Sequence, residues 1–245
     1  MEEQQLNYEY VSKEDISHLL AEEAPPKEGD GWVVVYESER MNVWRKKTET
    51  GHYILKAIVD AEVSADTICY VLTDIEFRRS WDNGGRDMQV IEKIDDNLDI
   101  IRFWAKTPVG FTDREWVQSR LIHKDEEGVH YVLYRSTQHK DWPEDPKKFV
   151  RAYTTISGYL LRPVDENNTK VLFVSQNDVK GSIPGWVINM LAGYFLKKWF
   201  GALRDACLKH HAEQQQLKAT KSKKKEEDGE GETKKVKKEK KNSEK

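Results

Sequence analysis

The sequence has no apolar run long enough to cross a bilayer, for which a helix needs about 20 predominantly apolar residues. Its longest apolar stretch, residues 183–196, is interrupted by Pro184 and Gly185 and is followed by Lys197 and Lys198. The first ten residues lack the basic cluster and the apolar segment of a secretory signal peptide. We therefore expect a cytoplasmic protein whose contact with membranes is peripheral and transient.

Cysteine is almost absent. Cys69 and Cys207 are the only two in 245 residues, which excludes a disulfide framework and favours a reducing compartment. The histidines show no metal-ligand spacing, and the sequence contains no nucleophile elbow, P-loop or Cys-x-x-Cys motif. We expect no metal, no cofactor and no enzymatic activity. A cyclase-like enzyme is a minor alternative, for which the sequence offers no good catalytic group.

Net charge is also small, at −3 overall, but it is unevenly distributed. Residues 218–245 contain 12 lysines and 7 acids, so this tail is +5 and the rest of the chain is −8. A negatively charged body argues against nucleic-acid binding, because phosphate backbones attract basic surfaces. The tail has almost no apolar residues with which to fold. It is either a solubilising tail, a segment attracted to anionic lipid or, as a weaker reading, a nuclear import signal.

These composition changes predict three parts. Residues 1–30 form an N-terminal helix and linker that pack on the domain, residues 31–213 form one folded domain, and residues 214–245 form a disordered Lys/Glu-rich tail. The body is expected to be a monomer.

Period-2 alternation of apolar and polar residues dominates the middle of the chain. It is clearest where Leu55 and Ala57 alternate with Lys56 and Asp60. Nine strands are predicted in this way, joined by short turn-rich connections typical of antiparallel hairpins: 32–36, 43–47, 53–62, 88–94, 98–106, 114–122, 129–136, 150–162 and 170–176. Short helices are predicted over 12–22, 65–72 and 75–81.

The last predicted element is a long helix over residues 183–214, which is rich in aromatic residues and has one broad apolar face. No other element is large enough to cover the sheet, so this helix must lie on the apolar face of the strands. The pattern predicts an α+β helix-grip fold, in which a curved antiparallel sheet wraps around a long C-terminal helix. The volume between them is either filled by side chains or left for a ligand.

Three segments resemble motifs of the START domains, the lipid-transfer family related to the steroidogenic acute regulatory protein. Phe77-Arg-Arg-Ser-Trp-Asp82 resembles the segment that follows the small helices, and Thr112-Asp-Arg-Glu-Trp-Val-Gln-Ser-Arg120 resembles the strand that ends in arginine. Residues 177–189 are similar to the family's Gly-x-hydrophobic-Pro-x-Trp segment, which opens the C-terminal helix. The resemblance is strongest to the phosphatidylcholine-transfer branch. It implies a tunnel for one lipid, covered by the C-terminal helix and by an omega loop at residues 137–149.

Arg78 is the main candidate for lipid binding. In the phosphatidylcholine-transfer branch the matching arginine holds the lipid phosphate, a contact that suits a guanidinium in a low-dielectric site. The alternative is a local i,i+4 ion pair with Asp82 on one face of the helix.

The resemblance also implies a set of residues around the lipid head group. Trp116 matches one aromatic of the box that surrounds choline, where cation–π attraction holds the quaternary ammonium. By period 2, Gln118 and Arg120 share the face of Trp116. The alternative to a lipid-binding role is that this face meets solvent or a salt-bridge partner. Three further positions complete the expected lipid-binding set: Phe103, Thr155 and Ser157. Phe103 and Thr155 occupy the other two positions of the box, where phenylalanine is a weaker cation–π partner than tryptophan and threonine is none. Ser157 replaces a longer, amide-bearing residue of the branch.

Further candidates concern how the lipid enters. Trp142 lies on the expected omega loop, where an amphipathic aromatic can either dip into a membrane or pack on its own loop. The remaining expected gate or membrane-contact residues belong to the C-terminal helix and the segment before it: Pro184, Trp186, Leu191 and Phe195.

The sequence thus predicts binding and transfer of one glycerophospholipid of the phosphatidylcholine or phosphatidylethanolamine kind. A sterol ligand is the nearest alternative, but sterol-type members carry a buried acid paired with the arginine that matches Arg120. Asp99 is the only acid on the corresponding strand and does not align convincingly. A lipid sensor or adaptor that does not transfer its ligand is the other alternative.

Overall fold

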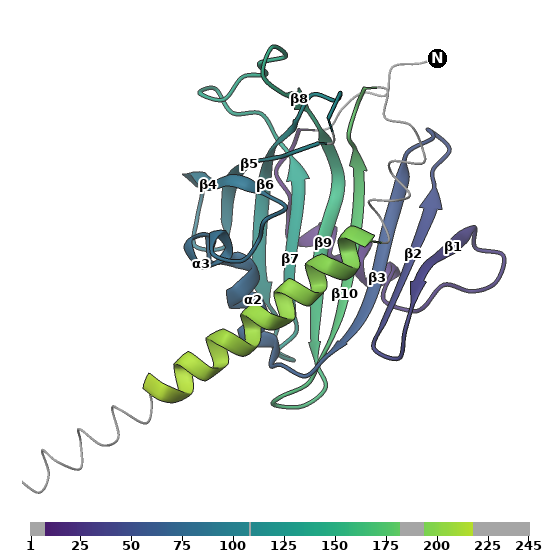
Figure 1. Ribbon diagram of the computed structural model, residues 1–245, viewed down its shortest axis with the longest axis vertical. Coiled ribbons are helices and arrows are strands. Elements are labelled where there is room, and N and C mark those ends of the chain that lie inside the picture. The colour runs from purple at the N-terminus through teal and green to yellow at the C-terminus, as the bar shows by residue number, and fades with distance from the viewer. Residues whose placement is uncertain (1–7, 108, 182–193, 218–245) are drawn as a thin grey trace, which may run out of the picture.

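The computed structural model describes residues 8–107, 109–181 and 194–217. A ten-stranded sheet curves around one face of the C-terminal helix, which is helical over residues 194–217 (Figure 1). The strands are β1 Trp32–Glu37, β2 Met41–Lys47, β3 Tyr53–Ala61, β4 Arg86–Lys93, β5 Leu98–Ala105, β6 Arg114–Lys124, β7 His130–Ser136, β8 Val150–Arg151, β9 Tyr153–Pro163 and β10 Thr169–Asp178. The shorter helices are η1 Lys13–Asp15, α1 Ile16–Ala21, α2 Ala65–Thr73 and α3 Ile75–Arg79.

The sheet follows the order β1-β2-β3-β10-β9-β7-β6-β5-β4, and every neighbouring pair on this path is antiparallel. The hairpin connections that the sequence predicts account for most of this order. The strand predicted over 150–162 is instead two strands, because β8 pairs in parallel with β6 whereas β9 pairs with β7 and β10. The predicted long helix is confirmed over residues 194–214 and continues to residue 217, and its first part lies outside the described residues.

Two N-caps define the helical corner that separates β3 from β4. The Ser64 side chain accepts a hydrogen bond from the backbone nitrogen of Thr67 and opens α2, and the Asp74 side chain accepts one from Phe77 and opens α3. Such caps satisfy backbone N–H groups that have no partner within the helix. As a result α3 begins immediately after α2 and carries Arg78 on its buried side.

The sheet is covered on both faces, and it separates two apolar clusters. On the inner face, the C-terminal helix packs against strands and α2 through Leu196, Trp199, Phe200 and Leu203. On the outer face, the N-terminal segment packs against β6, β7, β9 and β10 through residues such as Leu19. Figure 1 shows the C-terminal helix crossing the inner face diagonally, with η1 and α1 behind the sheet. No helix in these ranges is long and apolar enough to span a membrane.

The N-terminal segment is fastened to the outer face by buried polar contacts. Lys56 of β3 is 2% exposed and donates to the Glu22 carboxylate at 3.0 Å and to the Ala24 carbonyl at 2.7 Å. Arg135 of β7 pairs with Asp15. A buried ammonium needs such partners, so residues 8–24 behave as part of the domain rather than as a loose extension.

Candidate functional site

Arg78 lies in the core between α3, the C-terminal helix and the inner face of the sheet. It is 9% exposed, and its Nε donates to Asp82 at 2.9 Å while Nη1 donates to the Leu72 carbonyl at 3.0 Å. Its guanidinium carbon lies 5.9 Å from the ring centre of Trp199. The local ion pair with Asp82 therefore forms, and it holds a fixed cation at the point where the helix closes on the sheet.

Aromatic side chains surround this cation. Trp199 contacts Trp81 at 5.5 Å and Tyr159 at 5.9 Å between ring centres, and Tyr159 contacts Tyr134 at 6.4 Å. Burial raises the pKa of the Tyr159 hydroxyl, and the neighbouring Arg78 offsets this only in part. Two polar atoms of this cluster, Trp81 Nε1 and the Tyr134 hydroxyl, are inaccessible to solvent and have no hydrogen-bond partner among the described residues.

Strand β6 presents Trp116, Gln118 and Arg120 to the inner face, as the period-2 pattern predicts. Trp116 is opposite Phe103 of β5, and the two rings stack at 5.1 Å with an interplanar angle of 6°. Each ring thus covers one face of the other, so these two side chains do not form two walls of a box around a cation. Gln118 is 5% exposed and donates to Thr154 at 2.6 Å.

A polar band crosses the inner face above the apolar core, formed by Gln118, Thr154, Asn177, Ser175 and Ser157. Its members are joined by hydrogen bonds from Gln118 to Thr154, from Thr154 to Asn177 and from Asn177 to Ser175 at 2.7 Å. Ser157, 7% exposed, is opposite Ser175 and donates to it at 3.4 Å. This wall of the fold is therefore able to hydrogen-bond a polar ligand.

The expectation for Thr155 is wrong. The pairing of β9 with β10 shifts between Gln176 and Asn177, so that Thr154 instead of Thr155 is opposite Asn177. This bulge turns Thr154 to the inner face and leaves Thr155 exposed, with its carbonyl oxygen accepting a hydrogen bond from Arg135. A bulge inserts one residue and so reverses the alternation beyond it.

Arg120 has a buried acidic partner, which the sequence did not predict. Such a pair is expected of sterol-type members. Asp99 is directly opposite Arg120 in the pairing of β5 with β6. Arg120 donates to both Asp99 oxygens, at 3.0 and 2.6 Å, and to the Thr73 carbonyl at 2.8 Å. Asp99 is 8% exposed and Arg120 is 3% exposed. The buried pair weakens the sequence-based argument against a sterol.

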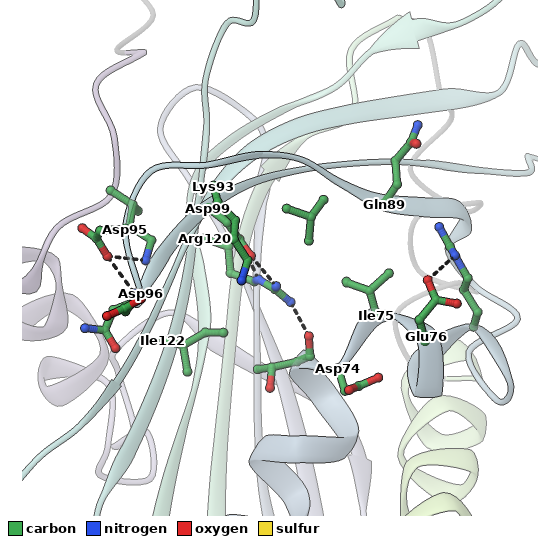
Figure 2. A pocket seen from close by; sticks show the side chains of 15 residues that line it. Asp74, Ile75, Glu76, Gln89, Lys93, Asp95, Asp96, Asp99, Arg120 and Ile122 are labelled. Carbon is green, nitrogen blue, oxygen red and sulfur yellow. Dashed lines mark hydrogen bonds and ion pairs between the residues drawn. The ribbon is translucent and has the colours of Figure 1, made fainter.

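This pair lines a cavity of about 610 Å³ at the edge of the inner face. Figure 2 shows Arg120 and Asp99 at its centre, between the β4–β5 turn with Asp95 and Asp96 and the start of α3 with Ile75. The lining holds more acids than bases, which suits neither a phosphate nor a free carboxylate.

Trp142 packs against an arginine of β5. Its ring packs 4.4 Å from the guanidinium carbon of Arg102, a residue of β5 that faces the outer side because its neighbours Ile101 and Phe103 contact the inner core. Arg151 donates to the Trp142 carbonyl at 3.1 Å. Residues 137–149 are therefore held against the outer face at this tryptophan, and the expected role of Trp142 in gating or membrane contact stays a prediction.

Of the gate residues predicted in the C-terminal helix and its approach, Pro184, Trp186 and Leu191 lie outside the described residues. Phe195 is 42% exposed and packs against Gly84, where an added Cβ would come within 2.7 Å of its ring. The glycine thus permits a close approach of the helix to the turn that follows α3.

Two further exposed apolar residues were not predicted. Val109, in the β5–β6 connection, is 104% exposed, and Tyr194 is 71% exposed. Arg114, at the start of β6, donates to the carbonyls of Val179 and Lys180. These bonds tie the start of β6 to the backbone that follows β10.

Several site residues were missed for identifiable reasons. Ser175 and Asn177 share the face of the buried Val171 by period 2, a signal that could have found them. Thr154 gave no signal because nothing in the residues marks the bulge. Tyr134 matches the pattern of an ordinary core aromatic, and only the structure shows that its hydroxyl has no hydrogen-bond partner among the described residues.

Comparison with known proteins agrees with this architecture. The START domain family model matches residues 21–214. Human START domain-containing protein 10 is 28% identical over 191 residues, which cover 76% of this chain and 64% of that protein. The bovine phosphatidylcholine transfer protein is 25% identical over 202 residues, 80% of this chain and 93% of that protein.

Solved structures share the fold at low identity. The crystal structure of human STARD10 gives a TM-score of 0.76 at 24% identity, covering 87% of this chain and 86% of that one. Human StAR-related lipid transfer protein 5 gives 0.72 at 17% identity, covering 81% and 95%. The chain spans slightly less than two thirds of START domain-containing protein 10. Because the family model covers well over half of its length, the chain belongs to the START domain family.

Proposed function

We propose that this protein binds one glycerophospholipid between the inner face of the sheet and the C-terminal helix and transfers it between membranes. The observation that carries the proposal is Arg78, a buried guanidinium held beside the closing helix by Asp82 and Leu72. A phosphate diester is a suitable partner for a guanidinium in a low-dielectric site. The name of one relative, phosphatidylcholine transfer protein, supports the same class of ligand.

The inner face favours a head group that makes hydrogen bonds over one recognised only by an aromatic box. Phe103 and Trp116 stack on each other, and Thr155 is on the outside. The polar band offers hydroxyl and amide oxygens within the same wall. An ethanolamine ammonium can donate to such oxygens, whereas choline cannot, so phosphatidylethanolamine is expected to bind at least as well as phosphatidylcholine.

Lipid would pass where apolar side chains are exposed. Val109 is exposed in the β5–β6 connection, and Tyr194 and Phe195 are exposed at the described start of the helix. Exposed aromatic and aliphatic side chains suit a transient contact with a bilayer interface. The proposal includes a monomer that meets membranes peripherally, with the basic tail as an optional attraction to anionic lipid.

The test is native mass spectrometry of the protein purified from cells, with identification of the extracted lipid, followed by transfer of labelled phosphatidylethanolamine between vesicles. Arg78→Met is expected to lose the bound lipid. Arg79→Met is the matched control, because Arg79 is next to Arg78 on α3 but its side chain is 42% exposed and pairs with Glu76. An Arg78→Met/Asp82→Asn double variant neutralises the carboxylate left behind, so that lipid loss can be separated from misfolding.

If the wild-type protein carries no glycerophospholipid and does not accelerate transfer, the proposal is wrong. Transfer that survives in the folded double variant would remove Arg78 from the site.

A sterol is the second candidate, and the buried Asp99–Arg120 pair beside the cavity of about 610 Å³ favours it. A sterol in the same extract, lost in a folded Arg120→Met variant and retained in Arg78→Met, would select this candidate. Phospholipid lost in Arg78→Met would select the first.

A further inference from the structure

The cavity of about 610 Å³ at the edge of the inner face has a negatively charged lining. Its side chains include five acids and three bases, a formal charge of −2. Two of the acids are paired with two of the bases, so the other three acids have only Lys93 to balance them. Figure 2 shows Asp95 and Asp96 on the β4–β5 turn and Asp74 at the start of α3, with Arg120 between them. The cavity therefore suits a cationic occupant.

The C-terminal helix runs past one wall of this cavity. His210 of the helix stacks on Tyr70 of α2 at 4.4 Å between ring centres, and it contacts Phe77 of α3 at 5.3 Å. Burial raises the pKa of the Tyr70 hydroxyl, as do the nearby carboxylates of Asp74 and Glu213. Because Asp74 lines the cavity, Tyr70 lies between the last described turns of the helix and the cavity wall.

The chain that follows this helix begins with a run of lysines. Residues 218–225 contain five lysines and no acid, and residues 226–232 contain five acids and no base. The helix takes the chain only about 6 Å beyond Glu213 before the described residues end. Eight extended residues span about 26–29 Å. The lysines of residues 218–225 can therefore reach the cavity of their own chain.

We propose that residues 218–225 dock in this cavity, with their ammonium groups beside the carboxylates of Asp74, Asp95 and Asp96. A lysine ammonium has three donors on a flexible stem, which suits a site where several carboxylates lie around an open volume. The short tether gives an effective concentration of about the millimolar range, so that contacts of low individual affinity suffice. The acids of residues 226–232 are repelled by the same lining, which leaves the second lysine cluster, residues 234–241, outside the cavity.

Docking withholds the first lysines from anionic membranes. An anionic lipid surface attracts clusters of lysine, whereas the rest of the chain, with its charge of −8, is repelled by it. The cavity and the membrane thus compete for the same segment. This inference goes beyond the proposed function and does not depend on which lipid the inner face binds.

Disulfide trapping in the full chain measures the docking. Asn97→Cys places a thiol in the cavity lining, and Ser222→Cys places one among the lysines without removing any of them. The natural Cys69 and Cys207 are 7% and 1% exposed, so they stay out of the reaction. Thr50→Cys with Ser222→Cys is the matched control pair, because Thr50 is exposed at the β2–β3 turn and four strands lie between β3 and β5.

In about 0.01 M salt, where the screening length is about 30 Å, the cavity pair should form its disulfide at least about tenfold faster than the control pair. In about 1 M salt, where that length is about 3 Å, the advantage should disappear. Lys223→Gln/Lys224→Gln should reduce it, whereas Lys237→Gln/Lys238→Gln in the second cluster should leave it unchanged. Phosphatidylserine vesicles should slow the cavity pair, and phosphatidylcholine vesicles should not.

Equal rates for the cavity pair and the control pair in low salt overturn the inference. A disulfide that joins two chains instead of closing within one also overturns it. The same holds if both lysine variants lower the rate alike, because the attraction then belongs to the whole tail and not to a docked segment. A rate that phosphatidylserine leaves unchanged overturns the competition with membranes.

Discussion

Replacing Glu115 by glutamine tests whether a buried charge network holds residues 137–149 to the outer face. The Glu115 side chain is 6% exposed and accepts from Arg102 at 2.7 and 2.8 Å and from Arg151 at 2.7 and 3.0 Å. Both arginine side chains are more than nine-tenths buried. The substitution keeps the shape of the side chain and one oxygen acceptor but removes the charge that balances two guanidinium groups.

Removing one partner of a buried ion pair typically costs about 3–5 kcal/mol, because the other charge stays buried without compensation. Here each arginine keeps a second partner. Arg102 retains Asp87 at 3.0 Å, and Arg151 retains the carbonyl of Trp142. We therefore expect the lower end, about 3 kcal/mol, which corresponds to a fall in melting temperature of about 6–12 °C for a domain of this size.

Urea unfolding followed by tryptophan fluorescence measures this change, and limited proteolysis reports whether residues 137–149 loosen. Glu62→Gln is the control, because Glu62 pairs with Arg40 where both side chains are more than half exposed, and its unfolding midpoint should not move measurably. If Glu115→Gln and Glu62→Gln have equal midpoints, the network does not hold the loop and the argument from burial fails.

Three further predictions follow from buried groups. Burial lowers the pKa of His130 below its ordinary 6.5 despite the contact with Asp66, so the unfolded chain takes up the proton at a higher pH than the folded protein does. The free energy of unfolding should therefore fall as the pH drops from 6.5 toward the lowered pKa of the folded state, and it should fall less in His130→Gln. Burial raises the pKa of Cys69 to about 11 and of Cys207 to about 12; a thiol reagent at pH 8 should label them only at the rate of unfolding, and fast labelling in native buffer would contradict this. Gly158→Ala places a Cβ 2.6 Å from the Val132 carbonyl and should destabilise the fold by about 1–3 kcal/mol in the same urea assay.

The sequence by itself determined the class of the fold and the position of its main cation. Alternation set the strands, short turn-rich connections set most of the antiparallel order, and a broad apolar stripe placed the C-terminal helix on the sheet. These features depend on neighbours within a few residues, for which local pattern is a sufficient guide. The family-like segment around Arg78 located the guanidinium that lies at the centre of the candidate site.

Only the tertiary structure decided which of the predicted side chains lie on the inner face with that cation and which lie elsewhere. A bulge exchanged Thr155 for Thr154, strand register placed Asp99 opposite Arg120, and packing put Trp142 on the outer face. The residue pattern likewise does not predict that the Tyr134 hydroxyl lacks a hydrogen-bond partner within residues 8–107, 109–181 and 194–217. Each of these outcomes depends on pairing between residues far apart in the chain, where a shift of one position reverses the face of every side chain that follows.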